Sequence, residues 1–93
     1  MNAPSSKLKI LLVDDHAVVR AGYRTLLEDV PGLEIVGEAD NGEVAVKMYV
    51  DLAPDVAIMD LSLPGIGGLE AIRRIVQRRH DARILAFSMH EDT

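Results

Sequence analysis

The feature that most limits the fold of this chain is a strict alternation of short apolar runs with longer amphipathic segments. Residues 8–13, 56–59 and 84–87 are nearly continuous apolar runs, too short for helices and typical of strands buried on both faces. Residues 33–39 alternate more between apolar and polar side chains, which predicts a strand with one wetter side, as at a sheet edge.

Three segments between these runs carry apolar residues at the spacing of a helix face. The first covers residues 17–29, the second runs from a cap at Asp40 or Asn41 to Ala53, and the third follows a loop rich in Gly and Pro. The predicted inward residues are Val18, Val19, Gly22, Tyr23, Leu26 and Leu27 in the first helix, Val44, Ala45, Met48 and Leu52 in the second, and Leu69, Ile72, Ile75 and Val76 in the third.

The order β-α-β-α-β-α-β favours an α/β fold, an open sheet of parallel strands joined by right-handed crossovers. Sheets of this kind bind ligands beyond the carboxyl ends of their strands. Asp14 and Asp15 follow the first predicted strand, Asp60 follows the third and Ser88 follows the fourth. We therefore expect these four side chains at one edge of the sheet.

Composition narrows the class of protein. Ninety-three residues suit one domain, and 48% apolar with 27% charged residues is typical of a soluble globular chain. A net charge of −5 disfavours a grip on nucleic acid by the whole chain, and the absence of Cys excludes disulfides and thiolate sites. No apolar run approaches the ~18 residues of a membrane span. We predict a cytoplasmic chain without a membrane partner, with a flexible tail at residues 1–6.

The three acids predict a particular chemistry if the first and third strands are neighbours. Two carboxylates about 4 to 5 Å apart repel by roughly 4 kcal/mol at an effective dielectric of about 20, so the pocket raises a pKa or holds a cation. Oxygen ligands favour Mg²⁺, and the carboxylate of Asp60 is a suitable nucleophile toward phosphorus. Each acid taken singly is equally well explained as a residue that ends a strand near a helix N-terminus; their coincidence indicates a site.

These residues together resemble the receiver domain of two-component response regulators. The resemblance covers residues 8–93 and is closest to the subfamily that precedes a LuxR-type helix-turn-helix domain (NarL/FixJ-like). It is carried by residues 10–16 (ILLVDDH), 19–22 (VRAG), 54–60 (PDVAIMD) and 59–65 (MDLSLPG), by the spacing of Asp60, Pro64 and Gly68, and by Ser88.

The resemblance implies a flavodoxin-like sheet with strand order 2-1-3-4. It implies that Asp60 accepts a phosphoryl group from a sensor histidine kinase, so that the chain is an acceptor and not an enzyme. Asp15 and Asp60 would bind Mg²⁺ directly, Asp14 through water, and Ser62 through its carbonyl oxygen. Ser88 would be the switch hydroxyl. Arg20, Arg24 and residues 63–67 are candidates for the kinase-docking surface by the same resemblance.

The family pattern continues with a helix, a fifth strand carrying a Lys, and a final helix, whereas the last Lys here is Lys47. Arg83 is no substitute, because it precedes the fourth strand and lies at the opposite end from the acids. We therefore expect a receiver domain at residues 7–93 that is incomplete at its C-terminus, with DNA contacted only through an output domain outside this chain. The open edge at residues 84–87 predicts a homodimer or a domain-swapped contact.

Three alternatives accompany this interpretation. One is a phosphorylation-impaired receiver that serves as a dimerisation or assembly module. A haloacid-dehalogenase-like phosphatase needs an acid at position 62, where this chain has Ser62. A nucleotide binder needs a Gly-rich loop after the first strand, where Asp14, Asp15, His16 and Ala17 stand instead. For His16 itself we predict a role at the loop or helix start, in preference to a metal ligand.

Overall fold

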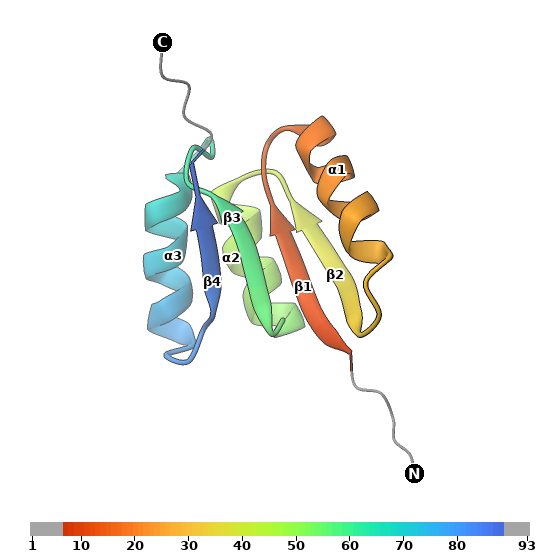
Figure 1. Cartoon of the computed structure of the whole chain (residues 1–93). Helices are drawn as coiled ribbons and strands as arrows, with labels where there is room; N and C mark the ends of the chain where they lie inside the picture. Colours follow the sequence, from red (N-terminus) through yellow and green to blue (C-terminus); the bar gives the residue numbers. More distant parts are fainter. Residues whose placement is uncertain (1–6, 89–93) are drawn as a thin grey trace.

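All four predicted strands form one parallel sheet in the computed structural model, which describes residues 7–88 (Figure 1). The order of strands across the sheet is β2-β1-β3-β4, which confirms the predicted 2-1-3-4 arrangement. The predicted tail at residues 1–6 and the last residues of the predicted domain, 89–93, lie outside the described residues. The elements are β1 (Leu8–Val13), α1 (Ala17–Glu28), β2 (Leu33–Ala39), α2 (Gly42–Leu52), β3 (Val56–Asp60), α3 (Gly67–Arg78) and β4 (Ile84–Phe87).

The strand register brings the carboxyl ends of β1, β3 and β4 to the same level. Val13 of β1 pairs with Met59 of β3, and Asp60 at the end of β3 pairs with Phe87 of β4. In Figure 1 these ends lie together at the upper edge of the sheet, beside the start of α1. Since Asp14 and Ser88 follow Val13 and Phe87 directly, the backbone alone places the predicted site residues along one edge.

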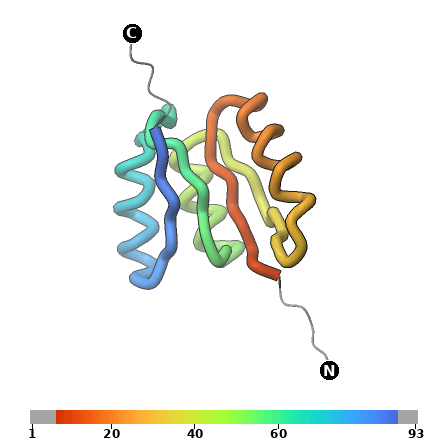
Figure 2. The backbone as a smooth tube through the Cα atoms, in the orientation of Figure 1, coloured from red at the N-terminus to blue at the C-terminus, as the bar shows by residue number. Residues whose placement is uncertain are grey.

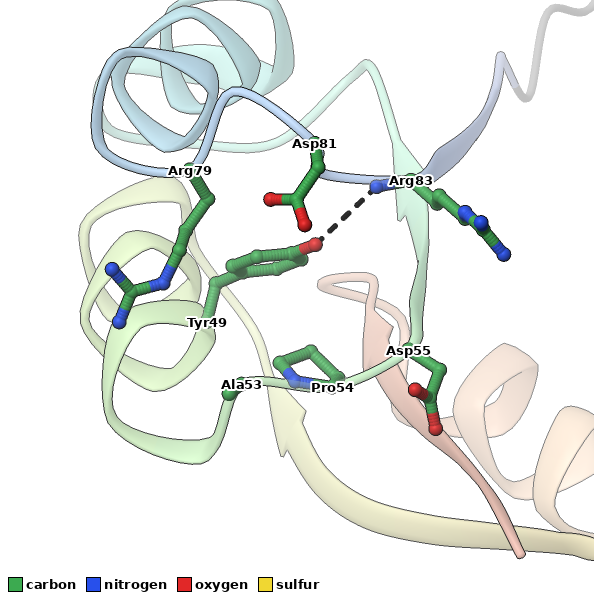
Figure 3. Close-up of a pocket in the computed structure, with 7 residues that line it drawn as sticks. All are labelled: Tyr49, Ala53, Pro54, Asp55, Arg79, Asp81 and Arg83. Carbon is green, nitrogen blue, oxygen red and sulfur yellow. Dashed lines mark hydrogen bonds between the residues drawn. The ribbon is translucent and has the colours of Figure 1, made fainter.

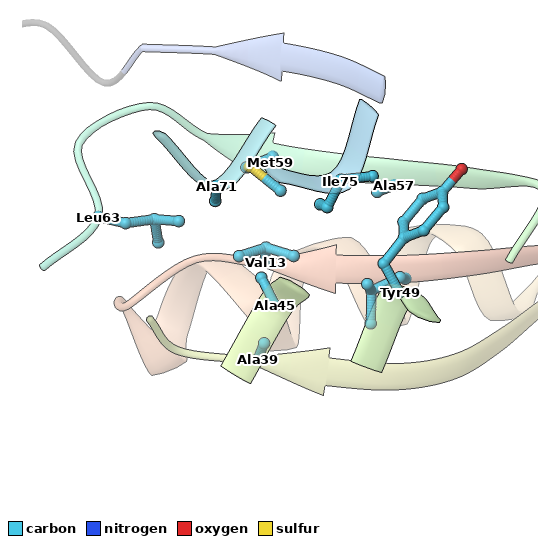
Figure 4. Packing of buried hydrophobic residues seen from close by; sticks show 10 residues of the cluster. Val13, Ala39, Ala45, Tyr49, Ala57, Met59, Leu63, Ala71 and Ile75 are labelled. Carbon is cyan, nitrogen blue, oxygen red and sulfur yellow. The ribbon is translucent and has the colours of Figure 1, made fainter. Parts of the chain in front are cut away.

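The sheet separates two apolar cores, and β1 contributes to both. Leu11 and Val13 point to the face covered by α2 and α3, where Ala45, Tyr49 and Ile75 meet them (Figure 4). Ile10 and Leu12 alternate to the other face. This alternation explains why β1 reads as continuous apolar sequence: a strand with helices on both sides has no solvent face.

The second core is smaller and belongs to α1. Tyr23 and Leu27 of α1 pack beside it, and the ring of Tyr23 lies 5.8 Å from that of Phe87. One helix therefore covers one face of the sheet and two cover the other, as right-handed crossovers require (Figure 2). No residue of α1 is fully buried.

Several helical residues that the sequence predicted to face the core are exposed in the structure. In α1, Val18 is 85% exposed, and in α3, Leu69 is 71% exposed, although both were predicted to face the core. The sheet-facing residues of α3 are Gly68, Ala71 and Ile75, spaced three and four residues apart. Because Gly68 and Ala71 are small, the helix lies close to the sheet and the larger Leu69 is turned outward.

The interpretation of α2 needs one correction and gains one detail. Tyr49 is buried in the core, whereas the predicted core residues Val44 and Leu52 are partly exposed. The cap that the sequence left open is Asn41, whose Oδ1 accepts a hydrogen bond of 2.9 Å from the backbone N–H of Val44. The arginines of α3 and its C-cap are exposed: Arg73, Arg74, Arg78 and Arg79.

Candidate phosphoacceptor and metal site

Four side chains converge at the carboxyl ends of β1 and β3. Asp14, Asp15, His16 and Asp60 each offer one ligand atom, and these atoms all lie within 4.8 Å of one another. Asp14 and Asp60 are buried, while Asp15 and His16 are exposed. The three acids predicted to share a pocket are therefore brought together, and a fourth residue joins them.

The carboxylate of Asp60 is held by its own loop. Its Oδ1 accepts a 2.9 Å hydrogen bond from the backbone N–H of Ser62. Its Oδ2 is buried and has no hydrogen-bond partner among residues 7–88. The two oxygens of Asp60 thus differ: one is oriented by the backbone and the other is unpartnered.

Asp14 shows the same asymmetry. Its Oδ1 accepts a 2.8 Å hydrogen bond from the backbone N–H of His16, which begins the turn into α1, whereas its Oδ2 is buried without a partner in the described part of the chain. A buried carboxylate oxygen without a partner is costly, and two of them side by side repel each other. Both costs fall when a cation binds between the oxygens, and an oxygen-rich donor set suits a hard divalent ion such as Mg²⁺.

His16 occupies the helix-start position that was predicted for it, but its ring also takes part in the acidic cluster. Nδ1 of His16 lies 2.8 Å from Oδ1 of Asp14, 3.2 Å from Oδ1 of Asp15 and 4.0 Å from Oδ2 of Asp60. The hydrogen bond to Asp14, and then the charge of Asp15, raise the pKa of His16 above its usual 6.5. The sequence interpretation missed this contact; the only available signal was that His16 directly follows the acid pair.

The remaining predicted residues lie at the same edge. Ser88 follows Phe87, whose carbonyl oxygen accepts a 2.8 Å hydrogen bond from the backbone N–H of Leu61, so Ser88 stands beside the loop that follows Asp60. Ser88 is exposed. Ser62 reaches the site through its backbone N–H group, which donates to Oδ1 of Asp60.

Arg20 and Arg24, predicted as docking residues, are engaged within the molecule. Both form ion pairs with Glu38 of β2, at 3.1 and 2.7 Å. Arg20 also donates a 2.6 Å hydrogen bond to the backbone carbonyl of Asp14. These contacts attach α1 to the strand ends that carry the acids. In the predicted docking loop, residues 63–67, Leu63 is buried in the core and is not available as surface.

Gly68 lets the first turn of α3 lie directly against the loop that follows Asp60. A Cβ atom at this position would lie 2.6 Å from the Cα of Leu61 and 2.8 Å from the carbonyl oxygen of Asp60. Both are backbone atoms, which cannot rotate away. The first turn of α3 therefore packs directly against the loop that carries the phosphoacceptor candidate, and only glycine allows this approach.

A cavity of about 410 Å³ lies at the other end of the sheet (Figure 3). There the phenolic oxygen of Tyr49 accepts a 3.3 Å hydrogen bond from the backbone N–H of Arg83. Since Arg83 stands just before β4, it is remote from the acids, as predicted. The lining residues are Tyr49, Ala53, Pro54, Asp55, Arg79, Asp81 and Arg83.

A buried aspartate at the end of an inner strand, with further acids beside it at the carboxyl ends of a parallel α/β sheet, is the arrangement that the sequence predicted for a receiver domain. The family described as response regulator receiver domain matches residues 10–93, and the chain belongs to this family. Receiver domains accept a phosphoryl group and are not enzymes in the usual sense. This membership sets aside the phosphatase and the nucleotide binder as alternatives.

Known relatives agree with the assignment. The chain is 51% identical over 85 residues to response regulator UvrY of Escherichia coli K12, covering 91% of this chain and 39% of UvrY. A LuxR-family response regulator from Aurantimonas sp. SI85-9A1 has the same fold, with a TM-score of 0.86, 50% identity, and coverage of 92% of this chain and 61% of that one. The receiver domain of the putative response regulator NarL from Mycobacterium tuberculosis matches with a TM-score of 0.86 at 30% identity, over 94% of this chain and 70% of that one.

These relatives support the NarL/FixJ-like subfamily that the sequence predicted. The chain spans about two fifths of the length of the curated relatives it matches. Among residues 7–88, no helix is both long and apolar enough to cross a membrane.

Proposed function

We propose that Asp60 accepts a phosphoryl group from a phosphohistidine of a sensor histidine kinase. In this transfer an oxygen of Asp60 forms a bond to phosphorus while the bond between phosphorus and the imidazole nitrogen breaks, and the imidazole, which carries a proton on its other ring nitrogen, leaves as the neutral base. The observation that carries the proposal is the state of Asp60: it is fully buried at the end of β3, oriented through Oδ1 by Ser62, and unpartnered at Oδ2.

The acids of the cluster are suited to hold Mg²⁺ for this step. Asp15 and Asp60 would bind the ion directly, Asp14 through water, and Ser62 through its carbonyl oxygen. When bound, Mg²⁺ offsets the negative charge of the transferring phosphoryl group. Oδ2 of Asp60 is the oxygen that faces His16 and has no hydrogen-bond partner among residues 7–88, so it is the better candidate for the ion. Oδ1 then remains to bond to phosphorus.

Ser88 is our candidate for the switch hydroxyl. A phosphoryl group on Asp60 adds nearly two negative charges and several strong acceptor oxygens. Ser88 follows Phe87, the residue that pairs with Asp60, so a displacement of the end of β4 that turned its hydroxyl toward Asp60 would let it donate to such an acceptor. We propose that this displacement is passed to a DNA-binding output domain in a longer cytoplasmic protein, and that phosphoryl transfer from small acyl phosphates and slow self-hydrolysis occur at the same aspartate.

The test is phosphorylation in vitro. The protein is incubated with Mg²⁺ and acetyl phosphate, and its intact mass is measured. We expect a base-labile gain of one phosphoryl group that requires Mg²⁺ and is lost in Asp60→Asn. Asp81→Asn is the matched control, because Asp81 is exposed at the opposite end of the sheet. A gain of mass that persists in Asp60→Asn would refute the assignment of the phosphoacceptor.

A second role, as an assembly module, is favoured by one observation. β4 is an edge strand of the described sheet, and Leu85 at its centre is 61% exposed. An open apolar edge promotes pairing with another chain. We propose that a second copy covers this edge, and sedimentation of the wild type against Leu85→Lys tests it: the variant should be monomeric at concentrations at which the wild type is a dimer. A monomeric wild type would contradict this role.

A further inference from the structure

We infer that His16 is a nitrogen ligand of the cation in this site, and that it shifts the preference of the site from Mg²⁺ toward Mn²⁺ and related transition ions. The inference rests on the proposed metal site and adds to it a residue and a selectivity that the acids alone do not provide.

The distances around Nδ1 of His16 fit a shared coordination shell. In an octahedral shell with ligands about 2.1 Å from the ion, adjacent ligand atoms lie about 3.0 Å apart and opposite ones about 4.2 Å apart. Nδ1 lies 3.2 Å from Oδ1 of Asp15, which is the separation of adjacent ligands, and 4.0 Å from Oδ2 of Asp60, which is close to that of opposite ligands. All four ligand atoms of the cluster lie within 4.8 Å of one another.

Two unpartnered carboxylate oxygens favour the binding of a cation at this position. Oδ2 of Asp60 and Oδ2 of Asp14 are buried and have no hydrogen-bond partner among the described residues. His16 stands on the solvent side of these oxygens, with about half of its side chain exposed, so an ion that reaches the acids from solvent meets the imidazole. Its backbone N–H is hydrogen-bonded to Asp14, which keeps the ring close to the acids.

The ligand chemistry then sets the selectivity. Mg²⁺ binds oxygen and keeps several waters, whereas imidazole nitrogen is a better ligand for first-row transition ions. Mn²⁺ accepts both oxygen and nitrogen donors, so a bond to His16 should raise the affinity of the site for Mn²⁺ more than its affinity for Mg²⁺. The ion would replace the proton that Nδ1 donates to Asp14, so that neutral imidazole with its proton on Nε2 presents the Nδ1 lone pair to the ion.

The experiment uses Mn²⁺ as a paramagnetic probe of the 93-residue protein. Pulsed electron paramagnetic resonance of the Mn²⁺ complex should show hyperfine coupling to a directly bound ¹⁴N nucleus. This coupling should vanish in His16→Gln and persist in His80→Gln, which removes an exposed histidine at the opposite end of the sheet. By calorimetry, His16→Gln should lower the affinity for Mn²⁺ by at least about tenfold, the range typical of perturbed metal sites, and change that for Mg²⁺ much less.

Each outcome has a distinct meaning. Mn²⁺ bound to the acids without ¹⁴N coupling overturns the role of His16 and leaves the proposed metal site intact. Tighter Mn²⁺ binding by His16→Gln also overturns it, because the imidazole would then compete with the ion. Absence of Mn²⁺ and Mg²⁺ binding overturns both this inference and the proposed metal site, while labelling of Asp60 is measured separately.

Discussion

Replacing a single glycine by alanine at two helical positions should change stability in opposite directions. Gly22 lies in α1 and Gly68 in the first turn of α3, so both substitutions remove backbone freedom from the unfolded chain and favour the helix. At Gly22 nothing lies within 4 Å of the added Cβ. We therefore expect Gly22→Ala to stabilise the protein by about 0.5 to 1 kcal/mol.

At Gly68 the same helical gain is opposed by a backbone clash. The added Cβ would lie 2.6 Å from the Cα of Leu61 and 2.8 Å from the carbonyl oxygen of Asp60, and the chain must shift to relieve both contacts. Overpacking of this kind costs about 1 to 3 kcal/mol, and the helical gain at this terminal position is at most about 1 kcal/mol. The clash wins, and we expect Gly68→Ala to destabilise the protein by about 1 to 2 kcal/mol.

Urea unfolding of the two variants and the wild type measures the difference. Thermal unfolding gives a second measure, because 1 kcal/mol shifts the melting temperature of a domain of this size by about 4 to 8 °C. Gly22→Ala should melt at a higher temperature than the wild type, and Gly68→Ala at a lower one. Since the clash falls on the Asp60 loop, Gly68→Ala should also reduce the stabilisation that Mg²⁺ gives. If Gly68→Ala is as stable as Gly22→Ala, the packing of α3 against the Asp60 loop is wrong.

Three further perturbations test the charges and the core. In buffer with a chelator, Asp60→Asn should raise the melting temperature, because it removes one of the crowded carboxylates. The repulsion between two such carboxylates is of the order of 4 kcal/mol at an effective dielectric of about 20. A lower melting temperature would contradict the crowding. Hydrogen bonds, above all from Arg73, lower the pKa of Glu70 from 4.5 to about 2. The contribution of Glu70 to stability is therefore present above pH 4.5 and is lost as pH falls toward 2. ¹³C NMR of the Glu70 carboxyl should show the lowered pKa, and a higher pKa in Arg73→Gln. A wild-type Glu70 titrating near 4.5 would contradict the ion pair. In α3, Leu69→Gln should change the free energy of unfolding by no more than about 0.5 kcal/mol, whereas Ile75→Ala should cost about 2 to 5 kcal/mol; similar losses would mean that the helix faces the sheet differently.

Much of this protein follows from local patterns in its sequence. The seven elements, their order and the parallel sheet depend on apolar periodicity and on residues that stop strands and helices, and these signals lie within a few positions of one another. The position of Asp14, Asp60 and Ser88 at one edge follows as well, because the carboxyl ends of parallel strands share an edge.

Tertiary structure alone decided which face each helix presents and how the site is lined. Leu69 and Val18 have positions that periodicity misjudged, because the rotation of a helix on a sheet depends on the sizes of residues that meet from distant segments, such as Ile75 of α3 and Leu11 of β1 in the larger core. The ring of His16 reaches Asp60 only because β1 and β3 are neighbours, although 44 positions separate the two residues in the sequence. A pattern of nearest neighbours carries no information on such a contact, since its energy arises from atoms that only the fold brings together.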